Sequence, residues 1–459
     1  MTAETCVAEE TGSSGRHARV RQSGAMALSC WFAVFAGYAA VVAIVTTGPS
    51  RLWGAWATAG YALAAAAAWW SRGSALPLLI GACGAVAAPT IWLAAGWQPG
   101  GEPAVVARAA SLLVRHGSPY LQSGQLLSAQ SYNPYLPAMS VFGFPYVAGL
   151  PGLLGNPASW MAVTTLALIA AAISVGLPRR PRYRAFDTRP LLRNMTLAVV
   201  TPVLALPIAL GTTDPQVIAL MCLALACASR SAEVRQAPGG PARVAPRPWG
   251  AAARWITWNG LAALAIGTAC AMKATAWPAL PVIAAMIAAR EGPRAAARFA
   301  GTAAAAAAVL AIALAPALIA QPGAFADNII AYPLGLARHL TTAASPLPGH
   351  LLASTGAPGR LVALGLLLAG AAAVAMSLVL RPPRDARAAA VRLALGLTML
   401  FTLAPDARFG YFAYPAALLG WLALTGSRAV GAERETHLSQ ARSRPRRARL
   451  RSRLVTRRT

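Results

Sequence analysis

Long apolar segments alternate with short polar ones along most of the chain. Each apolar segment is close to the roughly 20 residues that a helix needs to cross a bilayer. The pattern therefore predicts an all-α polytopic membrane domain over residues 26–428, with about 12 transmembrane helices. The predicted crossings lie near residues 27–47, 52–70, 75–95, 158–177, 194–211, 212–229, 255–272, 274–290, 299–320, 359–380, 393–410 and 411–428.

One further apolar segment, residues 136–157, is interrupted by Pro145, Pro151 and Gly152. If it crossed the membrane, the basic loop PRRPRYRAFDTRPLLR after the next crossing would lie outside. Cytoplasmic loops normally carry the excess of Arg and Lys. We therefore interpret residues 136–157 as re-entrant or interfacial, and whether they cross stays open.

The two ends of the chain are polar. We expect residues 1–25 to be a disordered cytoplasmic N-terminus, and residues 429–459 to be a basic cytoplasmic tail that binds anionic lipid. The acids Glu4, Glu9 and Glu10 do not suit a signal peptide, so the first crossing is expected to be a retained anchor. With both termini cytoplasmic, the large outer loops are about 96–137 and 321–358. We expect a multi-pass protein of the plasma membrane.

The first large outer loop begins with Glu102, and the segment after Pro103 has helical periodicity. Val105, Val106, Ala109, Leu112 and Leu113 recur at spacings of three and four residues, and Gly117 suits the helix end. This pattern predicts a short amphipathic helix on the membrane surface, with Glu102 at its start. The Tyr-rich loop that follows contains Tyr120 and Tyr132, which suit a membrane–water boundary.

Composition supports the membrane prediction. Hydrophobic residues make up 57% of the chain and charged residues only 12%. The net charge of +27 comes almost wholly from Arg, and about 33 Arg fall in predicted cytoplasmic segments against about six outside. This asymmetry explains the basic charge without a nucleic-acid partner. The six Cys have no CxxC spacing, so neither a zinc site nor a disulfide framework is indicated.

Four acids, Glu102, Asp214, Asp327 and Asp406, fall in predicted outer loops beside apolar helix ends. The predicted topology places Lys273, His339 and Arg408 at the same boundary. A carboxylate there suits a general base, and the cations suit a phosphate or pyrophosphate leaving group. Each residue also has a structural interpretation: helix cap, turn, local ion pair or snorkelling Lys. His116 with Glu102 is a weak metal signal.

Three motifs carry a family resemblance: the acid-led helix ending in GSPY, the following SYNPYLPAMSVFGFP, and RFGYFAYPAALL. In these the chain resembles polytopic GT-C-fold glycosyltransferases, and most of all actinobacterial glycosyltransferase family 87, which are polyprenol-phosphate-mannose-dependent mannosyltransferases. The resemblance implies a GT-C-like fold and hexose transfer, mannose above all, from a polyprenyl-phosphate donor to an extracytoplasmic lipid or glycan. It also implies that Glu102 is the base that deprotonates the acceptor hydroxyl. The family commonly has Asp there, and this chain has no DxD motif; a divalent metal requirement stays open.

By chemistry alone, the candidate substrate-binding residues are Tyr120, Tyr132, Asp214, Lys273, Asp327, His339, Asp406 and Arg408. A transporter or flippase of a lipid-linked or anionic substrate is the alternative function. It predicts acids at mid-membrane and broken helices in corresponding halves. A third hypothesis is a catalytically inactive relative with a role in assembly.

Overall fold

The computed structural model describes residues 3–71, 74–96, 101–177, 188–236, 257–339, 341 and 343–426. This part of the chain is helical, and its sole β-type pairing is an isolated bridge between Ala344 and Ala407. The helices of eight or more residues are α1 (Ala3–Val45), α2 (Gly48–Trp70), α4 (Ala88–Ala95), α5 (Gly101–His116), α8 (Pro157–Gly176), α9 (Thr188–Val200), α10 (Pro202–Ala209), α11 (Asp214–Gln236), α12 (Trp258–Met272), α13 (Ala279–Glu291), α14 (Pro293–Leu314), α17 (Ala357–Leu380), α18 (Ala386–Leu403) and α19 (Ala413–Gly426).

Shorter helices join these elements. They are α3 (Leu76–Ala82), η1 (Cys83–Ala87), η2 (Ser123–Gln125), η3 (Ala129–Ser131), η4 (Pro137–Gly143), α6 (Phe144–Val147), α7 (Gly152–Gly155), η6 (Ala274–Ala276), η7 (Pro316–Leu318), α15 (Pro322–Phe325), η8 (Ala326–Ala331), α16 (Pro348–Ala353) and η9 (Phe409–Phe412). Of these, η1 and η8 are π-helical turns.

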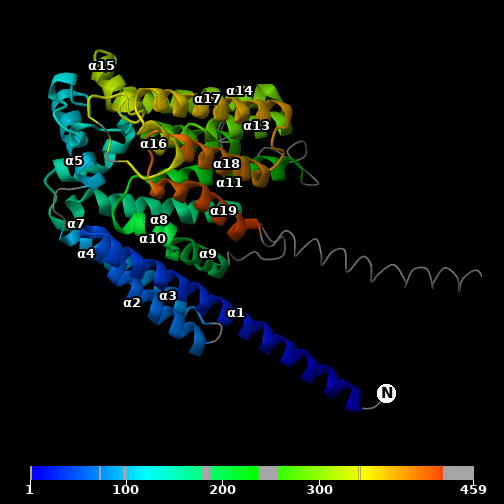
Figure 1. Cartoon of the computed structure of the whole chain (residues 1–459). Helices are drawn as coiled ribbons and strands as arrows, with labels where there is room; N and C mark the ends of the chain where they lie inside the picture. The colour runs from blue at the N-terminus through cyan, green and yellow to red at the C-terminus, as the bar shows by residue number, and fades with distance from the viewer. Residues whose placement is uncertain are drawn as a thin grey trace, which may run out of the picture.

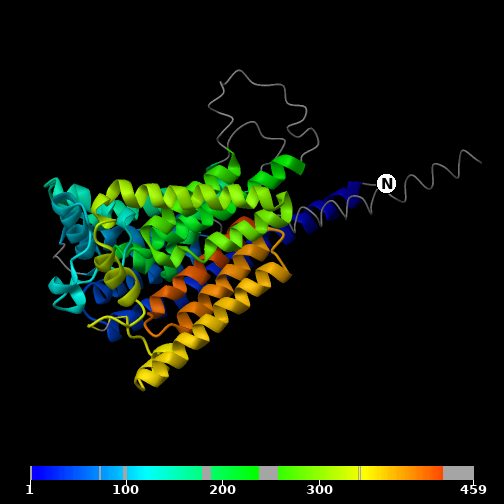
Figure 2. The same ribbon diagram turned by 90° about the horizontal axis from the view of Figure 1, so that it is seen from above.

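The long helices form a bundle whose two ends differ. In Figure 1, α5, α15 and α16 lie at one end, which we call the α5 end, and the N-terminus lies toward the other. Figure 2 shows the same separation after rotation, with the cyan and yellow connecting segments gathered at the α5 end. The bundle therefore brings the two predicted outer loops together.

Among the described residues, six helical stretches are long and apolar enough to cross a membrane: 24–45 of α1, 76–95 from α3 to α4, α8, α14, α17 and α18. The bent pair α9–α10 makes a seventh if it counts as one span. The chain is thus a multi-pass, all-α membrane protein. Every predicted crossing overlaps a helix or helix pair, with the differences given below, and the total of about 12 crossings stays a prediction.

The predicted crossing at 194–211 differs from the structure. It is broken between α9 and α10, whose axes differ by 75°. The break follows from Pro202, which lacks an N–H and begins α10 after the non-helical Thr201. The Tyr61 hydroxyl donates a 2.6 Å hydrogen bond to the Val200 carbonyl at the break. The bend is therefore held by a side chain of α2.

The crossing predicted at 393–410 is α18, which lies earlier in the chain. Asp385 accepts a hydrogen bond from the Ala388 N–H at 2.7 Å and so caps the helix start. The helix ends at Leu403, two residues before Pro405. Asp406 and Arg408 consequently lie in a connecting segment and are free of helical geometry, which allows both side chains to reach the site described below.

Residues 136–157 contain three short helices, η4, α6 and α7, and no helix long enough to cross a membrane. This agrees with a re-entrant or interfacial segment. At the N-terminus, α1 begins at Ala3 and so includes most of residues 1–25, for which the sequence predicts disorder. The predicted basic tail, 429–459, lies outside the described residues.

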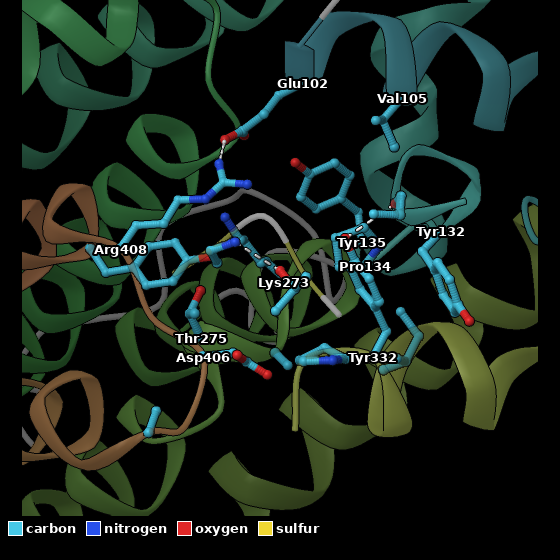
Figure 3. Close-up of a pocket in the computed structure, with 18 of the residues that line it drawn as sticks. Glu102, Val105, Tyr132, Pro134, Tyr135, Lys273, Thr275, Tyr332, Asp406 and Arg408 are labelled. Atoms are coloured by element: carbon cyan, nitrogen blue, oxygen red, sulfur yellow. Dashed lines mark hydrogen bonds and ion pairs between the residues drawn. The ribbon is translucent and has the colours of Figure 1, made fainter. Parts of the chain in front are cut away.

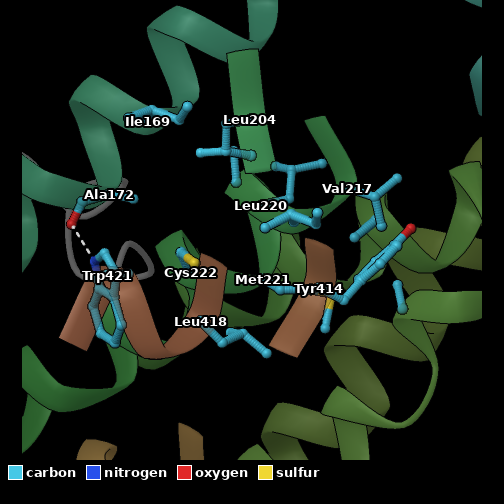
Figure 4. Close-up of a cluster of buried hydrophobic side chains, with 14 of the residues drawn as sticks. Ile169, Ala172, Leu204, Val217, Leu220, Met221, Cys222, Tyr414, Leu418 and Trp421 are labelled. Atoms are coloured by element: carbon cyan, nitrogen blue, oxygen red, sulfur yellow. Dashed lines mark hydrogen bonds between the residues drawn. The ribbon is translucent and has the colours of Figure 1, made fainter. Parts of the chain in front are cut away.

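The core that fixes the site lies where α8, α10, α11 and α19 meet (Figure 4). Ile169, Leu204 and Met221 are buried there beside Trp421, whose indole N–H donates to the Ala172 carbonyl at 3.3 Å. Between helices that lie in lipid, close van der Waals packing of such side chains and interhelical hydrogen bonds provide the association energy. This packing holds α11 and α19 in register, and both helices begin at the α5 end.

Candidate functional site

Helix α5 carries Glu102 in its first turn, as the periodicity predicts. Its apolar face packs against η4, α6 and α8. The contact with η4 is close, because a Cβ at Gly143 would lie 2.6 Å from Cβ of Ala110 and from the Val106 carbonyl oxygen. The prediction that this face lies on the membrane surface is therefore corrected: the apolar stripe covers other parts of the protein.

The start of α11 approaches the start of α5 through Gly211. This glycine has φ +64°, in the left-handed region that side chains disfavour. A Cβ at Gly211 would lie 2.3 Å from Cβ of Ala158 and 3.3 Å from Cγ of Pro103. The absence of a side chain at Gly211 thus lets Thr213 come within hydrogen-bond reach of Glu102, in the first turn of α5.

Lys273 follows the last residue of α12, where the helix dipole favours a cation. Its Nζ lies 2.5 Å from Oδ1 of Asp214 and donates to the Thr213 hydroxyl at 3.1 Å. The Tyr414 hydroxyl donates to the same Asp214 oxygen at 2.7 Å, and its partner at 2.7 Å is the Thr275 hydroxyl. The Lys273–Asp214 pair is therefore buried and hydrogen-bonded to Thr213 and Tyr414.

Glu102 lies beside this pair. Its Oε2 accepts two hydrogen bonds from Thr213, from the N–H at 2.8 Å and from the hydroxyl at 2.7 Å. Its Oε1 lies 3.5 Å from Nη1 of Arg408, which comes from the segment before η9. The Glu102 side chain is 16% exposed and the Arg408 side chain 42% exposed. The carboxylate is thus held firmly on one oxygen and loosely on the other.

The neighbouring charges determine whether Glu102 and Lys273 are ionised. Burial alone would raise the pKa of Glu102, but Lys273, the two Thr213 hydrogen bonds and Arg408 together hold that pKa below its ordinary value. Burial would likewise lower the pKa of Lys273, yet Asp214 and Glu102 raise it above its ordinary value. Both groups are therefore charged at neutral pH. The Lys273 ammonium also lies 5.4 Å from the ring centroids of Tyr135 and Tyr411.

These residues line a cavity of about 510 Å³, within the range of small-molecule sites. In Figure 3, Glu102 and Arg408 point toward one another on one side, Lys273 lies near the centre, and Tyr132 and Tyr332 lie on the opposite side. The polar and aromatic lining residues are Glu102, Arg108, Gln130, Tyr132, Tyr135, Lys273, Thr275, Tyr332, Thr341, Phe401, Asp406, Arg408 and Tyr411.

Asp406 belongs to a second part of the wall, away from Glu102 (Figure 3). Its Oδ1 lies 3.9 Å from Nδ1 of His350, and that ring nitrogen is 2.9 Å from the Pro405 carbonyl oxygen. Burial raises the pKa of Asp406, while His350 and Arg360 act in the opposite direction. Asp406 therefore pairs with groups of its own and not with Arg408, although the two are neighbours in the sequence.

The two candidate Tyr residues of the first outer loop differ in position: Tyr132 lines the cavity and Tyr120 does not. Tyr132 lines the cavity and stacks on Tyr332, with centroids 4.2 Å apart and planes 7° apart. Tyr120 does not line it, because its hydroxyl donates to the Tyr135 carbonyl at 3.0 Å and its ring packs against Phe325. These contacts give Tyr120 a structural role, and its predicted substrate contact stays a prediction.

Asp327 and His339 also lie outside the cavity lining. Asp327 accepts a hydrogen bond from the Ser123 hydroxyl and so joins the two outer loops. The ring centroids of His339 and Tyr132 lie 6.4 Å apart. Of the predicted substrate-binding set, the structure brings Asp214, Lys273 and Arg408 to Glu102, and places Tyr132 and Asp406 elsewhere on the same wall.

Several site residues were missed by the sequence analysis. The Glu102 and Asp214 carboxylates accept hydrogen bonds from Thr213 and Tyr414, and the Lys273 ammonium lies near the ring of Tyr411. The cavity is also lined by Tyr135 and Thr275. The only available signal was position: Thr213 precedes Asp214, and the two late Tyr belong to the RFGYFAYP motif. Within the described residues, no group of three or more His, Cys, Asp or Glu lies close enough to hold a metal ion.

No family model matches the chain, and no curated protein matches it. Two crystal structures of ArnT from Cupriavidus metallidurans are similar to it. The structure bound to undecaprenyl phosphate has a TM-score of 0.44 and 16% identity, over 77% of this chain and 60% of that chain. The apo structure has a TM-score of 0.41 and 15% identity, over 71% and 54%. The chain thus spans less than two thirds of either ArnT chain, and its activity has to be proposed from the contacts of its own residues.

Proposed function

We propose that this protein is a membrane glycosyltransferase of the GT-C type. It moves a hexose, which we propose is mannose, from a polyprenyl-phosphate donor to a hydroxyl of an extracytoplasmic lipid or glycan. In this proposal the α5 end faces outside and both termini face the cytoplasm. The observation that carries the proposal is the convergence of Glu102, Lys273 and Arg408, from distant parts of the chain, on one cavity at the end of an apolar bundle.

Glu102 is the proposed general base. The acceptor oxygen attacks the anomeric carbon of the sugar, and a Glu102 oxygen takes the hydroxyl proton. The carbon–oxygen bond to the phosphate breaks, and the phosphate leaves with the electron pair. A base must be ionised before it acts, and the lowered pKa of Glu102 meets this condition. A phosphate that draws Arg408 away from Oε1 also strengthens the base.

Lys273 and Arg408 are the proposed phosphate-stabilising cations. Arg408 is the more exposed of the two and its contact with Glu102 is long, so it is the cation proposed to meet a phosphate oxygen. Lys273 is fixed by Asp214 and Thr213 and contributes a positioned charge. Tyr132 and Asp406, on other parts of the wall, are proposed to contact the sugar or the acceptor.

The transporter alternative predicts acids inside the crossings. Within the described part of the chain, none of the six candidate spans contains Asp or Glu. The described acids with charged partners at the α5 end are instead grouped around one cavity. This distribution favours chemistry at the membrane boundary over an acid-coupled pathway through the membrane.

The test is sugar transfer from labelled polyprenyl-phosphate mannose in membranes that contain the protein. Glu102→Gln removes the base without changing its size, and we expect it to lower transfer at least about 100-fold at equal expression. Asp385→Asn is the control, because it removes an acid that caps the start of α18 and lies outside the cavity lining; it should retain transfer. If the parent transfers no sugar while it binds or moves the lipid, the transporter alternative replaces this proposal.

A further inference from the structure

Thr213 lies between Lys273 and Glu102 and is hydrogen-bonded to both. It is fully buried and lies immediately before α11. Its hydroxyl accepts a hydrogen bond from Lys273 Nζ and donates one to Glu102 Oε2, while its N–H donates to the same Glu102 oxygen. An ammonium group has donors only, so Lys273 fixes the direction of the Thr213 hydroxyl proton toward Glu102.

We propose that Thr213 is a positioning residue that holds Oε2 of Glu102 and leaves Oε1 as the oxygen that takes the acceptor's proton. The proposal rests on the function proposed above. Two donors on one oxygen fix the plane of the carboxylate, and the other oxygen then faces the half-exposed Arg408 at the cavity. Thr213 also makes the charge of Glu102 dependent on the Lys273–Asp214 pair.

A chain of hydrogen bonds links Thr213 to the Lys273–Asp214 pair and couples that pair to the charge of Glu102. Asp214 accepts from Lys273 and from the Tyr414 hydroxyl, and Thr275 completes the chain. Each donor in the chain is directed by the next acceptor, so the Thr213 proton has one orientation. A residue at position 213 without a hydroxyl would keep the backbone hydrogen bond to Glu102 but lose this link.

The expected consequence is a change in the acidity of Glu102. A hydrogen bond to an ionised group favours the charged form, and losing one such bond raises a carboxyl pKa by about one to two units. The titratable groups that face Glu102 from the packed elements are Tyr135, Asp214, Lys273, Arg408 and Tyr411. Replacing Thr213 alone leaves all five of these residues in the chain. A shift in the Glu102 pKa is therefore expected to come from the loss of the Thr213 hydroxyl.

The experiment follows the Glu102 carboxyl band by infrared titration of the full chain in membranes. The band is identified as the one absent from Glu102→Gln. In Thr213→Val, which keeps the shape, the protonated band should appear about one to two pH units higher than in the parent. In Thr213→Ser, which keeps the hydroxyl, it should stay within about half a unit. Thr213→Cys, with a weaker donor, should shift in the same direction by less.

Equal titration in the parent, the Val variant and the Cys variant would overturn the proposal, and either variant suffices if the other does not fold. The same variants are then assayed for transfer: the acid limb of kcat/KM should move upward with the infrared titration in Thr213→Val and not in Thr213→Ser. A purely structural role would lower activity without moving that limb. Because the infrared measurement needs no turnover, a parent without transfer activity overturns the proposed function and leaves the Thr213 result readable.

Discussion

The Lys273–Asp214 ion pair and the Arg408–Glu102 ion pair differ in how much each contributes to folding. The first has side-chain exposures of 8% and 10% and an N–O distance of 2.5 Å. The second is 3.5 Å long, and its Arg408 side chain is 42% exposed. Exposed pairs contribute about 0–1 kcal/mol, whereas removing one partner of a buried pair costs about 3–5 kcal/mol. The Lys273–Asp214 pair is therefore the one whose loss is expected to destabilise the protein.

We therefore predict that Asp214→Asn destabilises the protein by about 3–5 kcal/mol, because Lys273 keeps a buried charge without its carboxylate. The double variant Asp214→Asn/Lys273→Met should recover much of this loss, since Lys273 Nζ lies 5.4 Å from the ring centroids of both Tyr135 and Tyr411 and an apolar side chain suits that place. Thermal unfolding midpoints of the purified protein measure both. Arg408→Gln is the control, expected to change stability by less than about 1 kcal/mol; a double variant less stable than Asp214→Asn contradicts the prediction.

At the residue scale, charge was the part of the site that could be predicted. Glu102, Asp214 and Lys273 are unusual because ionisable groups beside apolar segments are costly. Thr213 and Tyr414 are equally central, yet Thr before an acid and Tyr at a membrane boundary are common residues in common positions. Their importance comes from what they touch, and those contacts join residues up to 200 positions apart in the chain. Sequence spacing holds no information on such contacts.

At the scale of the element, α5 and α11 meet because Gly211 has no side chain. A side chain at position 211 is disfavoured by the φ of +64°, and its Cβ would lie only 2.3 Å from Cβ of Ala158. Helix α5 itself could be predicted, since its apolar spacing and Gly117 define its length. The surface that its apolar face covers could not, because periodicity identifies an apolar stripe and does not distinguish lipid from a neighbouring helix. The break at Thr201 was missed for a related reason: hydropathy is continuous across it.

Gly211→Ala should therefore move the start of α11 away from α5. We expect a loss of about 2–4 kcal/mol from left-handed strain and the clash together, and a rise of the Glu102 titration midpoint as the Thr213 hydrogen bonds lengthen. Unfolding midpoints and the infrared titration measure the two effects. Gly149→Ala is matched to it, because Gly149 has φ +72° with nothing within 4 Å of a Cβ. The control should show strain alone, and an unchanged Glu102 titration in Gly211→Ala would refute the packing argument.

At the scale of the whole molecule, the cavity is closed by two loops that lie far apart in the sequence. Asn328 is fully buried; its side-chain oxygen accepts the Asn133 N–H at 2.8 Å, and its amide donates to the carbonyls of Leu121 and Ala324. The Tyr132–Tyr332 stack lies beside this contact. The bundle could be predicted from apolar segments, but the joining of its outer loops could not, since polar loops have no periodicity.

Asn328 is therefore predicted to control the opening of the cavity wall. Asn328→Ala leaves the buried Asn133 N–H without its acceptor, at a cost of about 1–3 kcal/mol, which corresponds to roughly 5- to 150-fold faster local opening. Hydrogen exchange of peptides from residues 117–137 and 321–339 measures this directly.

The matched control is Asn194→Ala, since Asn194 is also buried but donates to the Leu424 carbonyl, in α19 and away from these loops. Faster exchange confined to the two loops in Asn328→Ala, and absent from them in Asn194→Ala, means that one side chain couples both loops. Exchange that rises in only one loop means that the stack alone joins them, and exchange that rises throughout the bundle means that the loops are part of its folding core.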